Sequence, residues 1–228
     1  MSRHTGDDPR EFSLSIPGAG EVSALLLRPA TAHALFVLAH GAGAGMRHPF
    51  LESLSRELAV AGVATLRYQF PYMEQGRSVP DRPKVLTATV HAAIRTAIDG
   101  APDLPLIAGG KSMGGRMTSL AASEQRPKEL RGLAFVGFPL HPPNKPGTER
   151  AKHLNSVGLP MLFLQGTRDS LARLELLRPI CAALGPAVTL HIVDTADHSF
   201  HVLKRSGKTD AAALTELAQT ISSWAKNL

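Results

Sequence analysis

Cysteine, long apolar runs, aromatic residues and basic clusters are all scarce in this sequence, and each scarcity excludes a class of protein. The single cysteine, Cys181, rules out an internal disulfide and is typical of a reducing compartment. No apolar run approaches the roughly 20 residues of a membrane-spanning helix, and the N-terminus lacks the apolar core of a secretory signal peptide. We therefore expect a cytoplasmic protein that has no membrane partner.

The positive charge of the chain is dispersed. Lys and Arg number 25 against 19 Asp and Glu, which gives a formal net charge of +6. The basic residues form no block that would suggest an interaction tail. Aromatic residues make up only 5% of the chain, which leaves few side chains to stack on bases. This pattern is typical of a mixed solvated surface, and we expect no nucleic-acid partner.

The order of apolar segments predicts an α/β fold in a single domain over residues 1–228. Residues 1–10 are expected to form a flexible tail, and alternating apolar residues then predict a β-hairpin over residues 12–27. Apolar runs predict buried strands at residues 34–39, 63–68, 104–108, 133–136, 161–164 and 188–193. Amphipathic patterns predict helices at residues 50–61, 85–98, 113–125, 171–184 and 210–226. Strands alternating with helices indicate a doubly wound, mostly parallel sheet, in which ligands bind at the carboxyl ends of strands.

The glycine-rich run G-G-K-S-M-G-G, residues 109–115, has two interpretations. A phosphate-binding loop requires a glycine five positions before Gly110, where Pro105 stands. The same run matches G-x-S-x-G at Gly110, Ser112 and Gly114, with a predicted strand before it and a predicted helix after it. This second match predicts that a sharp turn presents Ser112 as a nucleophile.

A nucleophilic serine needs a histidine base and an acid that orients the base. In folds with this serine turn, the three residues follow one another in the order serine, acid, histidine. Asp169 comes just after one predicted strand, and His198 follows the last predicted strand. Asp169 has the alternative role of capping the next helix, and His201 is the alternative base. Order and place favour Ser112, Asp169 and His198.

Acyl transfer at a serine also needs donors for the oxyanion that develops on the carbonyl. One predicted donor is the backbone N–H of Met113, the residue after the nucleophile. The other is expected in the run H-G-A-G-A-G, residues 40–45, where Ala42 is the first candidate and Gly43 the second. The same run fails as a dinucleotide-binding loop, because a large residue occupies the third small position in both registers.

Five motifs, in order over residues 40–200, resemble the α/β-hydrolase superfamily: H-G-A-G-A-G, L-R-Y-Q-F-P-Y, G-G-K-S-M-G-G-R, L-Q-G-T-R-D and A-D-H-S-F. More narrowly, they are similar to the small dienelactone-hydrolase-like group, which includes the hydrolase-like domain of a chromatin-complex subunit and its testis-expressed relative. The resemblance implies an eight-stranded, mostly parallel sheet, a triad of Ser112, His198 and Asp169, and Met113 and Ala42 as oxyanion donors. Dienelactone hydrolases proper use a cysteine nucleophile, so their substrate is not implied.

The hypothesis is a serine hydrolase that cleaves carboxylic esters through an acyl-enzyme, with no metal or organic cofactor. Residues 139–158 contain four prolines and are too short for a cap domain, so we expect a short irregular flap and a site suited to small substrates. His40, Gly43, Lys111 and Arg47 are candidate substrate-binding residues, and the cations suit an anionic substrate. A thioesterase or amidase would use the same triad. The alternative from another class is a non-catalytic interaction protein that retains the fold.

Overall fold

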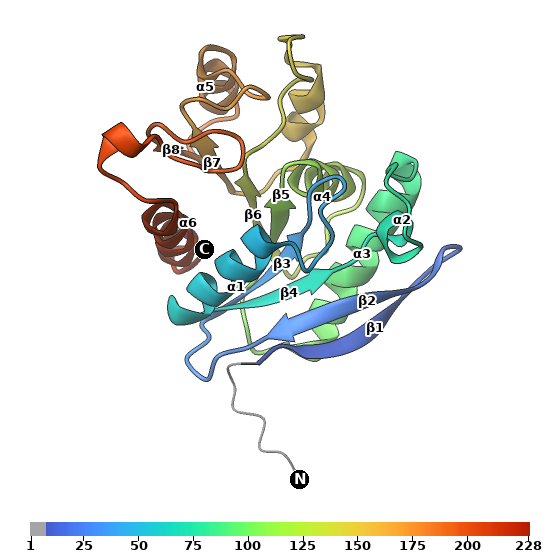
Figure 1. Ribbon diagram of the computed structural model, residues 1–228. Helices are drawn as coiled ribbons and strands as arrows, with labels where there is room; N and C mark the ends of the chain where they lie inside the picture. Colours follow the sequence, from blue (N-terminus) through green and yellow to red (C-terminus); the bar gives the residue numbers. More distant parts are fainter. Residues whose placement is uncertain (1–7) are drawn as a thin grey trace.

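The eight strands of the protein form one mixed sheet (Figure 1). The computed structural model describes residues 8–228. The strand order is β1-β2-β4-β3-β5-β6-β7-β8; β2 is antiparallel to both of its neighbours, and all the other pairs are parallel. The strands are β1 (Arg10–Ile16), β2 (Gly20–Leu27), β3 (Ala34–Ala39), β4 (Val63–Tyr68), β5 (Leu106–Lys111), β6 (Leu130–Val136), β7 (Met161–Gly166) and β8 (Val188–Val193). The predicted eight-stranded, mostly parallel sheet is confirmed.

Strand boundaries agree with the apolar runs for three of the six predicted strands and differ by two or three residues at an end of each of the other three. The runs predict β3, β4 and β8 to the residue. The prediction ends the central strand at residue 108, whereas β5 continues to Lys111, because Gly109 and Gly110 still pair with β3 and β6. Most of the expected tail lies outside the described residues, and its last residue, Arg10, already pairs with Leu26 in the hairpin.

Helices cover both faces of the sheet (Figure 1). They are α1 (Pro49–Val60), α2 (Pro71–Glu74), α3 (Pro83–Gly100), α4 (Met113–Glu124), α5 (Leu174–Ala183) and α6 (Asp210–Ala225). Two short 3-10 helices, η1 (Glu149–Ser156) and η2 (Lys204–Ser206), lie in the connections. Helices α1 and α6 pack side by side on one face, and α3, α4 and α5 cover the other.

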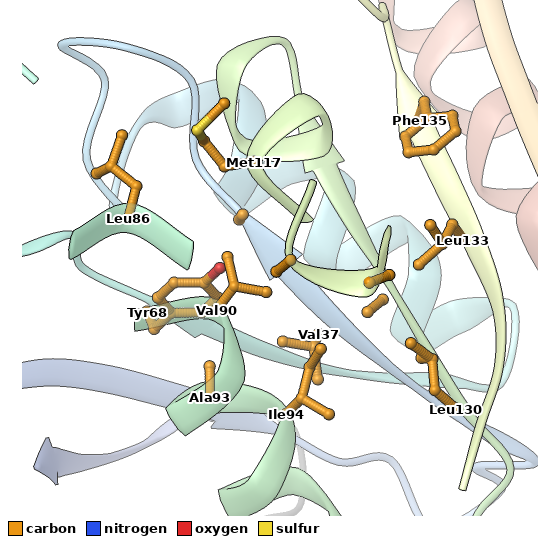
Figure 2. Packing of buried hydrophobic residues seen from close by; sticks show 14 of the residues in the cluster. Val37, Tyr68, Leu86, Val90, Ala93, Ile94, Met117, Leu130, Leu133 and Phe135 are labelled. Carbon is orange, nitrogen blue, oxygen red and sulfur yellow. The ribbon is translucent and has the colours of Figure 1, made fainter. Parts of the chain in front are cut away.

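The alternation of side chains along the buried strands divides the core into two layers. Val37 of β3 faces α3, while its neighbour Phe36 faces α1 and α6. Figure 2 shows Val90 and Ile94 of α3 lying over Val37 and Tyr68 of the sheet. Burying an apolar side chain of this size contributes about 1.5–3 kcal/mol to folding, so both layers are needed to hold the strands in register.

The strand order reverses next to β3, and this reversal determines where a site can form. The chain leaves β3 to build β4 on one side and later returns to build β5 on the other. The loops that follow β3 and β5 therefore diverge and leave a crevice at the carboxyl ends of these strands. The glycine-rich loop 40–45 and the turn at Ser112 both lie at this point.

Residues 139–158 differ from the expected irregular flap in their second half. There the chain forms η1, which packs against α4. His153 of η1 is 2.8 Å from the hydroxyl of Ser119 on α4, and Leu154 is buried. The side chains of η1 supply enough buried contact to order a segment in which the prolines suggested only irregular backbone.

We expect Gly109→Ala to lower the free energy of unfolding by more than about 4 kcal/mol or to prevent folding. Gly109 has a φ of +155°, and a Cβ there would lie 1.8 Å from the carbonyl oxygen of Ala134 on the neighbouring strand. Gly100→Ala is the matched control, because a Cβ at the end of α3 meets no atom within 4 Å, and the change raises helix propensity by up to about 1 kcal/mol. Chemical denaturation of both variants checks this; equal stabilities would contradict it.

Candidate active site

Ser112 lies on a strained turn between β5 and α4. Its φ is +51° and its ψ is −119°, a backbone conformation that non-glycine residues rarely adopt. The flanking glycines are required because the backbone passes close to β3 and the loop after it: a Cβ at Gly110 would lie 2.3 Å from the Ala39 carbonyl oxygen, and one at Gly114 would lie 2.5 Å from that of His40. The turn lifts the Ser112 hydroxyl over the end of the sheet.

Ser112, His198 and Asp169 form one chain of hydrogen bonds. The Oγ of Ser112 is 2.8 Å from Nε2 of His198, and Nδ1 of His198 is 2.6 Å from Oδ2 of Asp169. The three residues follow β5, β8 and β7, whose carboxyl ends meet at one edge of the sheet. This geometry lets the imidazole accept the serine proton while the carboxylate orients the ring.

Asp169 is held in place by contacts that the sequence did not reveal. Its side chain is 1% exposed, and its Oδ2 accepts a second hydrogen bond, from Nε2 of Gln165, at 2.5 Å. Gln165 is itself oriented, because its Oε1 accepts from the backbone N–H of Phe138. Oδ1 of Asp169 accepts from the N–H of Leu171 at 2.7 Å. Asp169 is therefore not the cap of α5, whose N-cap residue is Arg173.

The other histidines near the chain's end have partners of their own. His201, the alternative base, places Nδ1 2.6 Å from Oδ2 of Asp210, and its side chain is 68% exposed. The hydrogen bond that His201 donates to Asp210 raises the pKa of His201. His191 is 2.7 Å from Glu216. Of the three, the structure brings only His198 to Ser112.

The two expected oxyanion donors have backbone N–H groups available. Within residues 8–228, the N–H groups of Ala42 and Met113 make no hydrogen bond. Gly43, the second candidate in the loop, is occupied, because its N–H donates to the hydroxyl of Tyr72 at 3.1 Å. Ala42 is exposed and lies beside Ser112 in the wall of the same cavity.

A cavity of about 990 Å³ opens above Ser112. Ser112, His198 and Ala42 line it at the carboxyl ends of the strands, and it extends between α1 and α6. Most of its wall is apolar, with Phe50 and Leu214 the largest apolar side chains on the two helices. No residue of the segment 139–158 lines it, so the expected flap does not cover the site.

The fold and the hydrogen-bonded chain agree with a comparison against known protein families. Residues 32–226 match the family described as alpha/beta hydrolase domain. The chain belongs to this alpha/beta hydrolase family. The match runs from just before β3 to just after the end of α6 and so includes every residue of the site described above.

Solved structures share the fold of this alpha/beta hydrolase at low sequence identity. A dienelactone hydrolase from Anabaena variabilis is 23% identical with a TM-score of 0.75, covering 96% of this chain and 98% of that one. An alpha-beta serine hydrolase homologue from Coxiella burnetii is 19% identical with a TM-score of 0.73, covering 93% and 96%. A serine hydrolase without lid from Xanthomonas campestris is 18% identical with a TM-score of 0.71, covering 94% and 95%.

His40 of the hydrolase is a structural residue and not the substrate-binding residue that we expected. Its side chain is fully buried. Its Nδ1 is 2.7 Å from the Gly41 carbonyl, and its Nε2 accepts from the N–H of Phe70 at 3.1 Å. These contacts require a neutral ring with the proton on Nδ1. Burial lowers the pKa of His40 to about 4, although the hydrogen bond to Gly41 partly opposes the shift.

Two more of the expected substrate-binding residues lie away from the cavity. Gly43 is not among the lining residues and is bonded through its N–H to Tyr72. Arg47 forms an exposed ion pair with Glu11 of β1, 2.7 Å apart, on the other side of the loop. Loop 40–45 therefore places Gly41, Ala42 and Ala44 in the cavity wall, whereas Gly43 and Arg47 lie outside it.

Lys111 lines the cavity, but neighbouring groups occupy its ammonium. Nζ donates to the backbone carbonyl of His198 at 2.7 Å. It also lies 5.9 Å and 5.8 Å from the ring centroids of Phe50 and Phe200, which stack on each other. Both distances allow a cation–π interaction. Lys111 thus connects the turn at Ser112 with Phe50 of α1 and with the loop after β8 that contains His198 and Phe200.

Burial lowers the pKa of Lys111 to about 8, and the negative charges of Asp169 and Asp197 oppose part of that shift. Neither carboxylate forms an ion pair with the ammonium, so the charge is balanced by a carbonyl dipole and two aromatic faces.

Residues 8–228 contain neither a candidate metal site nor a helix suited to crossing a membrane. No group of three or more His, Cys, Asp or Glu side chains there is arranged to bind a metal ion. No helix in that range combines the length and the apolar character needed to cross a membrane.

We expect the stability of the hydrolase to fall between pH 6.5 and 4 because of His40. The unfolded chain protonates this histidine below about pH 6.5, whereas the folded protein keeps it neutral to about pH 4, so acid favours unfolding. At pH 5 the loss is about 2 kcal/mol, from 1.36 kcal/mol per pH unit. His40→Gln keeps an acceptor for Phe70 and should lose about 2 kcal/mol less between pH 7 and pH 5 in urea denaturation. Parallel losses in the two proteins would contradict this.

We expect Lys111→Met to slow the reaction of Ser112 with a fluorophosphonate roughly tenfold, because the His198 loop loses its hydrogen bond to the ammonium. The melting temperature at pH 7 should stay the same or rise, since a partly buried charge without a carboxylate partner has been removed. Labelling kinetics and thermal denaturation measure the two effects. An unchanged labelling rate would show that Lys111 does not position the loop.

Proposed function

We propose that this alpha/beta hydrolase cleaves carboxylic esters through an acyl-enzyme on Ser112. The observation that carries the proposal is the unbroken chain of hydrogen bonds from Asp169 through His198 to the Ser112 hydroxyl, at the mouth of an open cavity. A buried carboxylate, a histidine and a serine in this order are the parts that nucleophilic acyl transfer requires.

In the first half-reaction, Nε2 of His198 accepts the Ser112 proton while Oγ bonds to the carbonyl carbon. Negative charge develops on the carbonyl oxygen and is stabilised by the N–H groups of Met113 and Ala42. The bond to the alcohol oxygen then breaks, and His198 returns the proton to the leaving alcohol. Asp169 stays ionised and stabilises the imidazolium that forms between the two proton transfers.

In the second half-reaction, water replaces the alcohol. His198 removes a proton from the water as its oxygen attacks the acyl carbon, and the same two N–H groups stabilise the second oxyanion. The Ser112–acyl bond breaks, Ser112 recovers the proton from His198, and the carboxylic acid leaves. Thioesters and amides present the same carbonyl to these residues, so a substrate series distinguishes them.

The charges around the cavity favour a neutral substrate over the anionic one considered from the sequence. The ammonium of Lys111 is occupied by the His198 carbonyl and two rings. Arg47 is paired with Glu11, and the cavity wall contains the carboxylates of Glu57 and Asp210. An anionic group would therefore approach the carboxylate of Glu57 and the Asp210–His201 pair without a free cation to receive it.

The five sequence motifs support a narrower assignment within the family. We infer membership of the small dienelactone-hydrolase-like group that includes the hydrolase-like domain of a chromatin-complex subunit and its testis-expressed relative. The single cysteine supports a cytoplasmic location.

We expect a fluorophosphonate probe to label Ser112, as located by peptide mapping. Ser112→Ala should abolish labelling, and His198→Ala should slow it roughly 10³-fold, because the serine loses its base. His201→Ala is the matched control from the same loop and should keep labelling within about fivefold, since its ring is bonded to Asp210 and not to Ser112.

The reverse pattern, with label lost in His201→Ala and kept in His198→Ala, would assign the base to His201. No label on the folded wild-type protein would contradict the enzymatic proposal and favour a non-catalytic interaction protein with the same fold.

A further inference from the structure

The cavity at Ser112 continues as a groove between α1 and α6. Phe50 and Glu57 of α1 form one wall, and Ala211 and Leu214 of α6 form the other. The two helices lie on the same face of the sheet (Figure 1). Their N-terminal ends both face the serine turn, because residues near each N-terminus line the same cavity as Ser112. The groove therefore leads away from the reacting hydroxyl.

Two of the three polar side chains that α1 and α6 place along this groove, Glu57 and Asp210, are already bonded, and the third is the exposed Ser53. Oε2 of Glu57 accepts from the hydroxyl of Thr215 at 2.8 Å, which links α1 to α6. The carboxylate of Asp210 accepts from the N–H of Val202 at 2.8 Å and pairs with His201. The surface left for a ligand is mainly that of Phe50, Ala211 and Leu214.

The groove has a defined length. It begins at Phe50, whose ring lies beside Lys111 at the serine turn. Glu57, which bonds to Thr215 of α6, is the last residue of α1 that lines it. Phe50 and Glu57 are seven residues apart, which corresponds to about 10 Å along a helix. A zigzag chain of about eight carbon atoms, with bonds of about 1.5 Å, has this length.

We propose that the α1–α6 groove binds an uncharged apolar chain of the ester, about eight carbons long, while the ester carbonyl lies at Ser112. This assignment rests on the proposed function and adds the substrate class. This apolar chain is either the acyl chain or the alcohol chain of the ester, because both are attached to the carbonyl group that lies at Ser112. Phe50 and Leu214 contact the chain, and its length is limited because the part of α1 that lines the groove ends at Glu57.

The groove predicts a dependence of kcat/KM on chain length. Each fully buried methylene group strengthens binding about fourfold. A methylene group that an open groove buries by half strengthens binding about twofold. From a two-carbon to an eight-carbon chain, kcat/KM should rise about 60-fold by this measure. Beyond about eight carbons it should level off, because the part of α1 that lines the groove ends at Glu57.

The experiment uses the whole protein and two ester series, one with the acyl chain lengthened and one with the alcohol chain lengthened. Ala211→Phe places a ring in the groove and should reduce the eight-carbon to two-carbon ratio of kcat/KM about tenfold. Ala212→Phe is the matched control: Ala212 is equally exposed on the same turn of α6 and does not line the cavity. That variant should keep the wild-type ratio.

The series whose ratio depends on Ala211 identifies which part of the ester carries the chain. Ratios near one in both series, or equal losses in the two variants, would overturn the groove assignment. Labelling of Ser112 by methyl and octyl fluorophosphonates separates this failure from failure of the proposed function. If the methyl and octyl probes label Ser112 at equal rates, only the groove assignment is overturned. If neither probe labels Ser112, both proposals are overturned.

Discussion

At Gly110 and Gly114, on either side of the turn after β5, the backbone runs so close to β3 and the loop after it that a Cβ atom does not fit. A Cβ at Gly110 or Gly114 would come within 2.3 Å and 2.5 Å of carbonyl oxygens on Ala39 and His40. This close approach allows α4 to begin directly at the strand end and forces the strained turn at Ser112, which costs of order 1–3 kcal/mol. The two packed layers of the core offset that cost, so the hydroxyl is in position before a substrate binds.

The residues around Ser112 are held mostly by neutral groups and backbone dipoles. Gln165 and a backbone N–H complete the hydrogen bonds of Asp169, and a carbonyl and two aromatic rings surround the ammonium of Lys111. His40 stays uncharged in the loop beneath. Because these groups are ordered by the fold itself, the proposed reaction would need little reorganisation when charge develops on a substrate carbonyl oxygen.

The open side of the site follows from where the connections pack. The segment after β6, which the prolines suggested as a flap, ends in η1 on the face covered by α4. The cavity is left to α1 and α6, which line it with Phe50, Leu51, Ala211 and Leu214 and with the polar Ser53, Glu57 and Asp210. Under the proposed function, selectivity would come from the shape of the groove between α1 and α6 and not from a lid.

The strands β3, β4 and β8, the serine turn and the order of serine, acid and histidine were all readable from the sequence, because each depends on neighbouring residues and on backbone sterics. The places of His40, Gly43 and Arg47 were not, and neither was the support that Gln165 gives to Asp169. Those contacts join residues far apart in the chain, and strand register and burial decide them. Local chemistry thus determined which groups could react, whereas only the packed sheet decided which of them face the cavity.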